Sequence, residues 1–546
     1  IKYYRNRADA LAQLNEITNL TNYRNIGYPS TQNIWVRIDS DILNTCYGLG
    51  PWVTLNVQAK PFAHTVTIPR QCDDNTDGIF NFNTANLESD LLLGQTGVAV
   101  TYFDSSNNPL RDSNNNLITS PFPATFSSTS QTIRAVVTNT TPTVAYRGAG
   151  RPEATAAIER TIDEFARVCG IDPAEVRRKN YIAPSAFPLT TSMGAKYDSG
   201  EYAAALELAL QAAGYDELRR DQAARRASNN PVQLGIGLAS YVETTNPMGS
   251  GDYGAVEITA DGGAIIRTGS SSHGQGHHTA WSMIVSQSTG IPMDKIEFRF
   301  GDTDDIDHGG GTGGSRSLQV GGSAAKLAAD AVIEKARQRA ADLLEAAVED
   351  IVIDTVRGGF HVKGSPTPVR TWADLMVAVD APLEAEIDFV PEGATFPFGT
   401  HVCVVEVDIE TGSVGVVRHI ACDDAGTIIN PLLVDGQVHG GVAQGIAQAL
   451  LEVVAYDPDG NPITSNLADY GFISAAELPS FERVPMETPT PRNPLGAKGI
   501  GEAGTIGATP AVHNAVIDAV SHLGVTHIDM PCTAFNVWSA IQSVQN

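Results

Sequence analysis

The chain has 546 residues, 42% of them hydrophobic, so it is long enough to form several domains. Its formal net charge of −26 argues against nucleic acid and anionic membrane surfaces as partners. No secretory leader and no apolar run long enough to span a bilayer is visible, and because the chain begins at Ile1 rather than Met, we expect a piece of a longer protein.

The composition changes near residue 140. The first 139 residues hold 18 asparagines but only 6 of the 51 glycines, and nearly all of the net negative charge follows them. This change predicts that two segments of different origin meet there. The six cysteines include no C-x-x-C pair, which excludes an encoded iron–sulfur site or zinc ribbon. Cys46 and Cys72 could form a disulfide or remain free thiols.

The first segment alternates polar and apolar residues, as in 33–38 and 97–103, which predicts β-strands. It also repeats itself, since two short matches share the same offset of 99 residues: 1–4 with 100–103, and 30–34 with 129–133.

On these matches the segment resembles the Ig-like β-sandwich repeats of large secreted adhesin-type proteins from gliding bacteria. The resemblance implies a partial repeat at 1–69, a second repeat at 70–139 and a secreted origin. Residues 73–78 read D-x-N-x-D-G, the start of a calcium loop, but Thr84 stands where the bidentate Glu belongs. A solvated turn is therefore favoured over a calcium site.

The second segment opens with a Tyr-Arg pair and a glycine turn. Arg147 precedes Gly148, Ala149 and Gly150, and helical spacing from Pro152 predicts a helix ending near Cys169. Free N–H groups at such a helix start can bind an anion or an oxo ligand. Further helices are predicted at 173–180, 202–213, 279–288, 324–349 and 510–523, and strands at 255–259, 264–268, 295–300, 400–409 and 414–422.

Three more glycine-rich stretches precede predicted helices. Residues 269–279 carry Gln275 between Gly274 and Gly276; their histidines do not favour zinc, because glycines interrupt the helix that i, i+4 ligands need. Residues 309–317, with Gly314, Ser315, Arg316 and Ser317, favour a phosphate cradle over a plain turn. Residues 436–445, with Gln437, open another predicted helix.

A fifth glycine-rich loop, 496–507, contains Glu502, with Lys498 and Gly501 nearby. A carboxylate among glycines can act as a base toward a ligand held against the backbone, although an incidental Glu on a flexible loop explains this stretch alone equally well. Together the five loops predict one extended, phosphate-bearing cofactor with a carboxylate facing its reactive end.

Five motifs, in this order, resemble the large, molybdopterin-binding subunit of the xanthine dehydrogenase/aldehyde oxidase family: AYRGAGRPEA, GQGHHT, GGSRS, GQVHGGVAQG and GAKGIGEAGTIG. The resemblance runs from about residue 138 to 546. It implies α+β molybdopterin-binding domains, with the end of a first domain at 140–190 and a second domain at 191–546. The whole chain is thus expected to be multidomain, with an all-β segment followed by α+β domains.

The resemblance also implies roles for individual residues. Glu502 would be the general base of an oxidative hydroxylation that takes its oxygen from water. Arg147, Gly148 and Ala149 would lie beside the metal, which the pterin holds without a protein ligand. Around the pterin and its dinucleotide the resemblance places Gly274, Gln275, Gly276, Gly314, Ser315, Arg316, Ser317, Gln437, Lys498 and Gly501.

The implied cofactor is molybdopterin cytosine dinucleotide, with FAD and [2Fe-2S] clusters on partner subunits. Carbon monoxide dehydrogenases of this family carry a cysteine after the Tyr-Arg pair; Gly148 and Ala149 stand there instead, so an aldehyde or an N-heterocycle is the expected substrate. Two loops that line the family's molybdenum pocket upstream of Arg147 are not found here, so this chain alone is expected to bind the cofactor weakly or not at all.

Three hypotheses follow. The chain is a molybdenum hydroxylase large subunit, a secreted adhesive or binding protein, or an inactive chimera that lacks half of the molybdenum site. The enzyme segment favours the cytoplasm or the periplasm, whereas the repeats favour a secreted origin.

Overall fold

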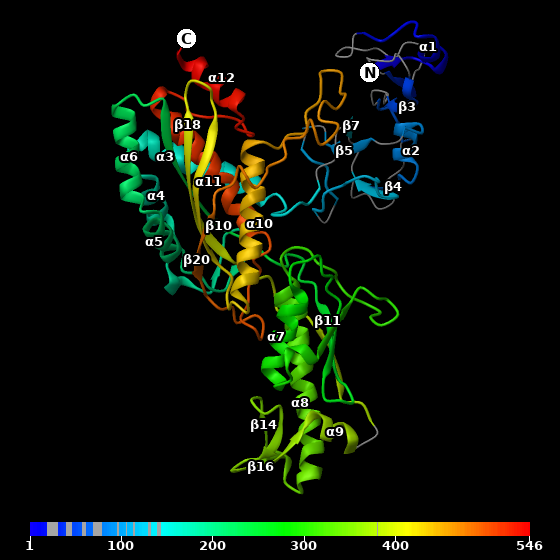
Figure 1. Cartoon of the computed structure of the whole chain (residues 1–546), viewed down its shortest axis with the longest axis vertical. Helices are drawn as coiled ribbons and strands as arrows, with labels where there is room; N and C mark the ends of the chain where they lie inside the picture. Colours follow the sequence, from blue (N-terminus) through cyan, green and yellow to red (C-terminus); the bar gives the residue numbers. More distant parts are fainter. Residues whose placement is uncertain are drawn as a thin grey trace. The chain divides into compact units, whose positions relative to one another are not determined.

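The computed structural model describes residues 1–18, 31–39, 46–56, 62–68, 79–95, 98–104, 106, 108–112, 115–128, 133–138, 144–378 and 381–545. Within it the chain forms two compact units: residues 1–143 with 454–469, and residues 144–453 with 470–546 (Figure 1). Residues 73–78 and Cys72 lie outside the described residues, so the calcium turn and the Cys46–Cys72 pair stay predictions.

In its described residues, the first unit contains short antiparallel sheets and two short helices. Sheet β1-β2-β3 and the pairs β4-β6 and β5-β7 are formed there. The element bounds are β1 Lys2–Tyr4, α1 Arg7–Ala12, β2 Thr31–Asp39, β3 Cys46–Asn56, β4 Phe80–Asn83, α2 Leu87–Leu92, β5 Ala99–Phe103, β6 Thr125–Ser128 and β7 Arg134–Thr138.

The two halves of this unit repeat one strand pairing. Tyr4 of β1 lies opposite Trp35 of β2, and Phe103 of β5 lies opposite Arg134 of β7. Each residue of the second pair is 99 positions after its counterpart, the offset seen in the sequence. The repeat therefore extends from sequence to strand register.

The second unit is built around the sheet β10-β18-β19-β20, formed by Val232–Val242, Phe398–Asp408, Val414–Asp424 and Phe481–Met486. Alternate side chains of its long central strands point to opposite faces, as strand geometry requires. Helices α5 Tyr202–Ala213 and α6 Tyr215–Ala227 lie on one face. Helices α3 Arg151–Cys169, α10 Pro431–Leu450 and α11 Ala503–Val520 pack on the other side (Figure 1).

Glycines bring α11 close to this sheet. A Cβ on Gly235 or Gly237 of β10 would lie 2.0 Å from the carbonyl oxygen of Ala515 or Ala511, respectively. On the other side of α11, a Cβ on Gly441 of α10 would lie 2.9 Å from the Cα of Gly504. Helix α11 is thus held between β10 along its middle and α10 at its start, next to the N-cap residue Glu502.

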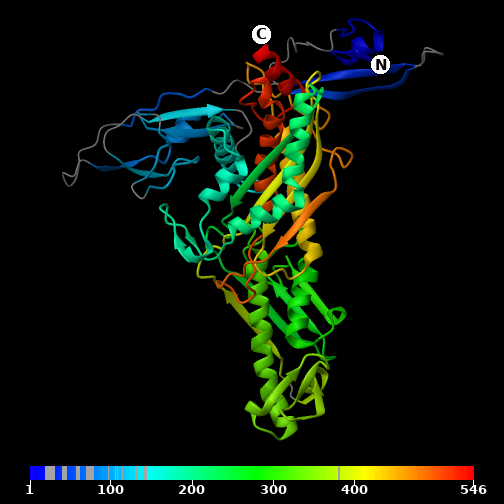
Figure 2. The ribbon, with the colours of Figure 1, turned by 90° about the vertical axis from the view of Figure 1, so that its left-hand side faces the viewer.

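A second sheet, β13-β12-β11-β17, packs on helix α8 Ser323–Leu344, which runs lengthwise beside it (Figure 2). Its strands are Ile296–Phe300, Ala264–Thr268, Asp252–Ile258 and Glu384–Phe389. The remaining elements are α4 Pro173–Asn180, α7 His277–Thr289, α9 Trp372–Ala378, α12 Ala534–Gln545, β8 Leu189–Thr190, β9 Lys196–Tyr197, β14 Ile351–Asp354, β15 Gly359–Val362 and β16 Ser365–Thr371, with a short π-helical segment at Leu318–Gly322.

Several predicted boundaries are wrong. Helix α11 begins at Ala503 rather than near residue 510, and Pro510 lies inside it. Helix α10 begins at Pro431, so the stretch 436–445 is no loop but part of a helix, where glycine allows close packing. Helix α8 ends at Leu344 rather than 349. In contrast, the predicted helices 173–180 and 202–213 are confirmed.

Within the described residues, no helix combines the length and the apolar character that crossing a bilayer requires.

Candidate active site

Glu502 is the N-cap residue of α11, yet its side chain makes no bond to its own helix. The main-chain N–H of Gly148 donates to Oε1 at 3.0 Å, and the hydroxyl of Ser315 donates to Oε2 at 2.6 Å. The residue is 8% exposed. A helix N-terminus favours negative charge, so both the dipole and the two donors stabilise the carboxylate here.

The turn before α3 needs its glycine. Gly148 has a φ of 102°, and a Cβ there would lie 2.5 Å from Cγ of Pro152. Ala149 also has a positive φ, 48°, which is strained for a residue with a side chain. This backbone aims the Gly148 N–H at Glu502.

Arg147 ties this turn to the Glu502 loop and to α10. Its Nε donates to the carbonyl of Gly501 at 2.5 Å, and its terminal nitrogens donate to the main-chain carbonyl of Gln437 at 2.9 Å and to the side chain of Gln444 at 3.2 Å. The pKa of Arg147 is lowered, and burial of the guanidinium is the largest cause. The guanidinium thus fixes three segments relative to one another.

A cavity of about 150 Å³ adjoins this arrangement. It is lined by residues from four predicted motifs, including Gln275, Ser315, Arg316, Ser317, Gln437, Lys498 and Gly501. Gly499 admits the close approach of two of these segments, because a Cβ on it would lie 2.2 Å from the Ser315 carbonyl. The tertiary structure therefore brings together segments spread over more than 200 residues of sequence.

Family models match both segments of the chain. A "Molybdopterin cofactor-binding domain" matches residues 208–479, and a second model of the same description matches 121–181. A "Flavobacterium inter-domain disulphide bond domain" matches twice, at 1–61 and 69–147.

Similar proteins cover about three quarters of this chain. The carbon monoxide dehydrogenase large chain of Hydrogenophaga pseudoflava is 40% identical over 75% of this chain and 53% of its own length. The solved Cu,Mo-CO dehydrogenase aligns with a TM-score of 0.71 at 35% identity, over 76% of this chain and 56% of its own. Quinoline 2-oxidoreductase of Pseudomonas putida 86 aligns with a TM-score of 0.70 at 34% identity, over 76% and 55%.

This chain belongs to the molybdopterin-binding large-subunit family of xanthine dehydrogenase and aldehyde oxidase. It spans about half the length of the curated relatives that it matches. Its second segment has the α+β architecture of molybdenum hydroxylase large subunits, within a multidomain chain.

The cavity fits the polar cofactor of this family. Nδ1 of His277 and Nε1 of Trp281 are buried at its wall without a partner in the described part of the chain. A Cβ on Gly274 or Gly313 would meet open space in the predicted loops. Unpartnered nitrogens and room beside glycine backbone are what a ligand rich in acceptor oxygens requires.

Lys498 lies at the cavity wall, but its ammonium is already engaged. Nζ lies 2.7 Å from Oδ2 of Asp424, and both side chains are 0% exposed. Burial raises the pKa of Asp424, while the charge of Lys498 lowers it. The pair joins the Glu502 loop to the end of β19, so the structure indicates that Lys498 supports the loop.

The other predicted residues differ in their surroundings. Arg316 is buried and donates to the Ser250 hydroxyl at 2.6 Å, and Ser317 lies 3.0 Å from the Thr312 hydroxyl. Gln275 donates to the Ser271 carbonyl at 3.2 Å. The remaining glycines, Gly274, Gly276 and Gly314, all have positive φ and shape their loops.

Sequence reasoning missed several residues of this region: Glu243, His277 as a wall residue, Trp281 and Asp424. His277 belongs to the stretch 269–279 but was considered there only as a zinc ligand, and the other three belong to no glycine-rich motif. The helix start at Pro431 was detectable, because Asn430 followed by proline is a helix N-cap pattern, and its side chain accepts from Leu433 N–H at 3.1 Å.

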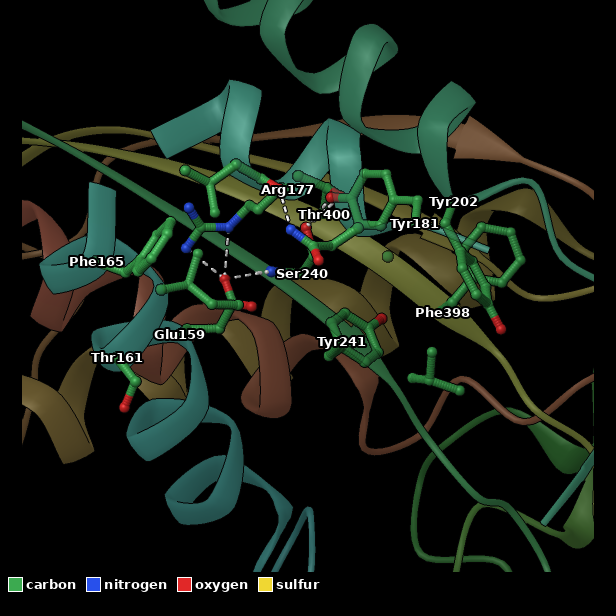
Figure 3. Close-up of a pocket in the computed structure, with 15 residues that line it drawn as sticks. Glu159, Thr161, Phe165, Arg177, Tyr181, Tyr202, Ser240, Tyr241, Phe398 and Thr400 are labelled. Atoms are coloured by element: carbon green, nitrogen blue, oxygen red, sulfur yellow. Dashed lines mark hydrogen bonds and ion pairs between the residues drawn. The ribbon is translucent and has the colours of Figure 1, made fainter. Parts of the chain in front are cut away.

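A second cavity, of about 540 Å³, contains none of the predicted site residues. Aromatic and aliphatic side chains such as Phe165 and Phe398 line it, with the Tyr181 and Thr400 hydroxyls on one wall (Figure 3). The buried ion pair of Arg177 and Glu159 forms another part of the cavity wall, and the Ser240 N–H donates to Glu159 at 3.0 Å (Figure 3).

Proposed function

We propose that this chain provides the base and much of the cofactor pocket of a molybdenum hydroxylase, which oxidatively hydroxylates an aldehyde or an N-heterocycle with oxygen from water. One observation carries the proposal: Glu502 is held by Gly148 and Ser315 next to a cavity lined by four glycine-rich motifs. A positioned, buried carboxylate can accept a proton from a group bound in that cavity.

When bound, the molybdenum–pterin group supplies the two-electron acceptor and the site that activates water. This chain's residues have other tasks. Glu502 accepts the proton, Gly148 and Ser315 hold its oxygens, and Arg147 keeps the Gly501 carbonyl and α10 in place. Gln275, Ser315, Arg316, Ser317 and Gln437 supply hydrogen-bonding groups around the cofactor.

The substrate class rests on the turn beside the base. Gly148 and Ala149 form the turn whose N–H contacts Glu502, and no described cysteine lines the cofactor cavity. A site without a thiol favours hydroxylation of an aldehyde or N-heterocycle carbon over the oxidation of carbon monoxide. The proposed form of the cofactor is molybdopterin cytosine dinucleotide, and electrons would leave through partner subunits carrying [2Fe-2S] clusters and FAD.

The test is Glu502→Gln in the assembled enzyme, with Glu297→Gln as the matched control, because the Glu297 side chain on β13 is exposed. The expected result is a loss of about 10²- to 10⁴-fold in kcat with unchanged molybdenum content, because only the proton acceptor is removed. Turnover equal to that of the control would overturn the proposal. Stoichiometric molybdenum on the isolated chain would in turn contradict the expected weak binding.

A second candidate function rests on the twofold match of the inter-domain disulphide bond domain. Under it, residues 1–69 and 70–139 form Ig-like repeats of a secreted binding protein, and 140–190 and 191–546 are molybdopterin-binding domains carried along in a chimera. Amplification across codons 130–150 from source DNA, followed by cell fractionation, separates the two: an intact cytoplasmic or periplasmic product supports the enzyme, whereas a secreted product supports the binding protein.

A further inference from the structure

A second carboxyl group, that of Glu243, is buried behind the base. Glu243 follows β10 directly, and its N–H donates to the Pro397 carbonyl at 2.8 Å. Its side chain is 0% exposed, and it lies beside the Ser315 hydroxyl and the Glu502 carboxyl. The Ser315 hydroxyl donates to Glu502, and neither oxygen of Glu243 has a hydrogen bond of good geometry from the described part of the chain. A buried carboxylate without donors is strongly disfavoured, whereas a protonated carboxyl brings its own donor.

Four charged or titratable groups face Glu243 from the surrounding elements. These are Glu502 at the start of α11, Arg151 on α3, Arg147 in the preceding turn and Tyr241 on its own strand. Arg151 donates to the carbonyls of Gly148 and Thr244, at 3.2 and 2.8 Å. Because the guanidinium groups of Arg147 and Arg151 are directed at carbonyl oxygens, neither neutralises Glu243 through an ion pair.

On balance these surroundings favour the protonated form of Glu243. Burial raises the pKa of Glu243 well above its ordinary value, and the charge of Glu502 raises it further, against a smaller lowering by Arg151. Two neighbouring carboxyl groups in one buried site cannot both be ionised at low cost. Glu502 accepts hydrogen bonds from Gly148 and Ser315, so it is the member of the pair equipped to carry the charge.

We propose that Glu243 is a positioning residue for the base: a neutral carboxylic acid that shares its proton with the Glu502 carboxylate. The base then has three hydrogen-bond donors, one of them from the strand end behind it. The catalytic meaning of this contact rests on the proposed function, but the protonation state of Glu243 does not, so the two can be tested separately.

The first test compares the melting temperatures of the full chain and Glu243→Gln at pH 5 and pH 8. A carboxyl whose pKa is raised on folding binds its proton more tightly in the folded state than in the unfolded state, where its pKa is near 4.5. Its contribution to stability is therefore present below that value and is lost as pH rises. Glutamine does not titrate, so the variant does not lose this stability as pH rises. The melting temperature of the variant minus that of wild type should therefore increase by about 4 °C from pH 5 to pH 8.

Glu297→Gln is the control, because Glu297 is exposed and its neighbour Arg299 lowers its pKa. It should not gain stability relative to wild type with rising pH. An equal difference at both pH values for Glu243→Gln would overturn the proposal.

The second test does not depend on that variant folding. With ¹³C-labelled glutamate, the infrared difference between wild type and Glu502→Gln at pH 8 should show the C=O band of a protonated carboxyl that shifts, since its acceptor changes from a carboxylate to an amide. Glu243→Gln should lack the band. If neither variant changes the band, Glu243 and Glu502 do not share a proton, whatever the activity of the assembled enzyme. If the band changes but Glu502→Gln turns over as fast as wild type, Glu243 is neutral and the proposed function is wrong.

Discussion

The N–H of Gly148 and the carboxylate of Glu502 are joined by a hydrogen bond of 3.0 Å across 354 residues of sequence. One partner lies in a turn before α3, and the other caps α11. Since α3 and α11 also pack against each other, the bond is part of a rigid contact between two helix starts. One oxygen of the proposed base is therefore oriented by a main-chain donor, while the other is held by the Ser315 side chain.

Ser315→Ala should weaken the base without removing it. The variant loses the 2.6 Å hydrogen bond to Oε2 of Glu502, while the Gly148 N–H still donates to Oε1. Alanine has the same Cβ as serine, so the positive φ at position 315 is no harder to adopt. A hydrogen bond to a charged group contributes about 1.5–3 kcal/mol, so kcat/KM should fall about 10- to 100-fold in the assembled enzyme. The control Ser365→Ala, at the exposed start of β16, should have the kcat/KM of wild type. If Ser315→Ala also has the kcat/KM of wild type, its hydrogen bond to Glu502 has no catalytic role.

Gly237→Ala should severely destabilise the second unit. The added methyl would lie 2.0 Å from the Ala511 carbonyl, so α11 would have to move away from β10. Overpacking of this kind costs about 1–3 kcal/mol or more, which urea denaturation followed by tryptophan fluorescence can measure. Gly415→Ala in the same sheet meets open space and should cost well under 1 kcal/mol, so equal costs at the two positions would contradict this packing.

Arg177→Ala should destabilise the protein far more than Arg299→Ala. Arg177 is 1% exposed and lies 2.5 Å from Glu159 and 2.8 Å from Asp163, so its removal leaves two buried carboxylates without their cation. Breaking such a site costs about 3–5 kcal/mol. The Arg299–Glu297 pair is largely exposed and contributes about 0–1 kcal/mol. Similar denaturation midpoints for the two variants would show that the buried site is not a stabilising contact.

His513 should make stability fall at acidic pH. Burial lowers its pKa to about 4, and its Nε2 lies 2.7 Å from the Ile528 carbonyl, to which the neutral ring can donate. Because the unfolded chain takes up this proton near pH 6.5 and the folded chain only near 4, stability is lost as pH falls between these values.

His513→Gln should remove that part of the slope. The unfolding free energies of wild type and variant, measured at pH 7 and pH 4.5, give the comparison, and the difference between them should change by about 2–3 kcal/mol. Parallel pH dependences would mean that His513 does not titrate on unfolding.

The sequence alone determined which stretches carry the chemistry. Glycine-rich motifs, the Tyr-Arg pair and Glu502 are visible without coordinates because their function depends on local backbone freedom and on residue type. The helical spacing of apolar residues is likewise a local property, and the helix that it predicts at 202–213 is present in the structure. The 99-residue repeat was also visible, since it needs only two copies of one pattern.

Tertiary structure decided which side chains meet. Glu243 follows a strand and resembles any surface glutamate in the sequence; only the packing of α11 and α3 against β10 makes it a buried neighbour of the base. Lys498 reads as a cofactor ligand, but the fold brings Asp424 to it from 74 residues away. Contacts of this kind depend on long-range packing, where burial and desolvation set the charge of a group, and no local pattern records them.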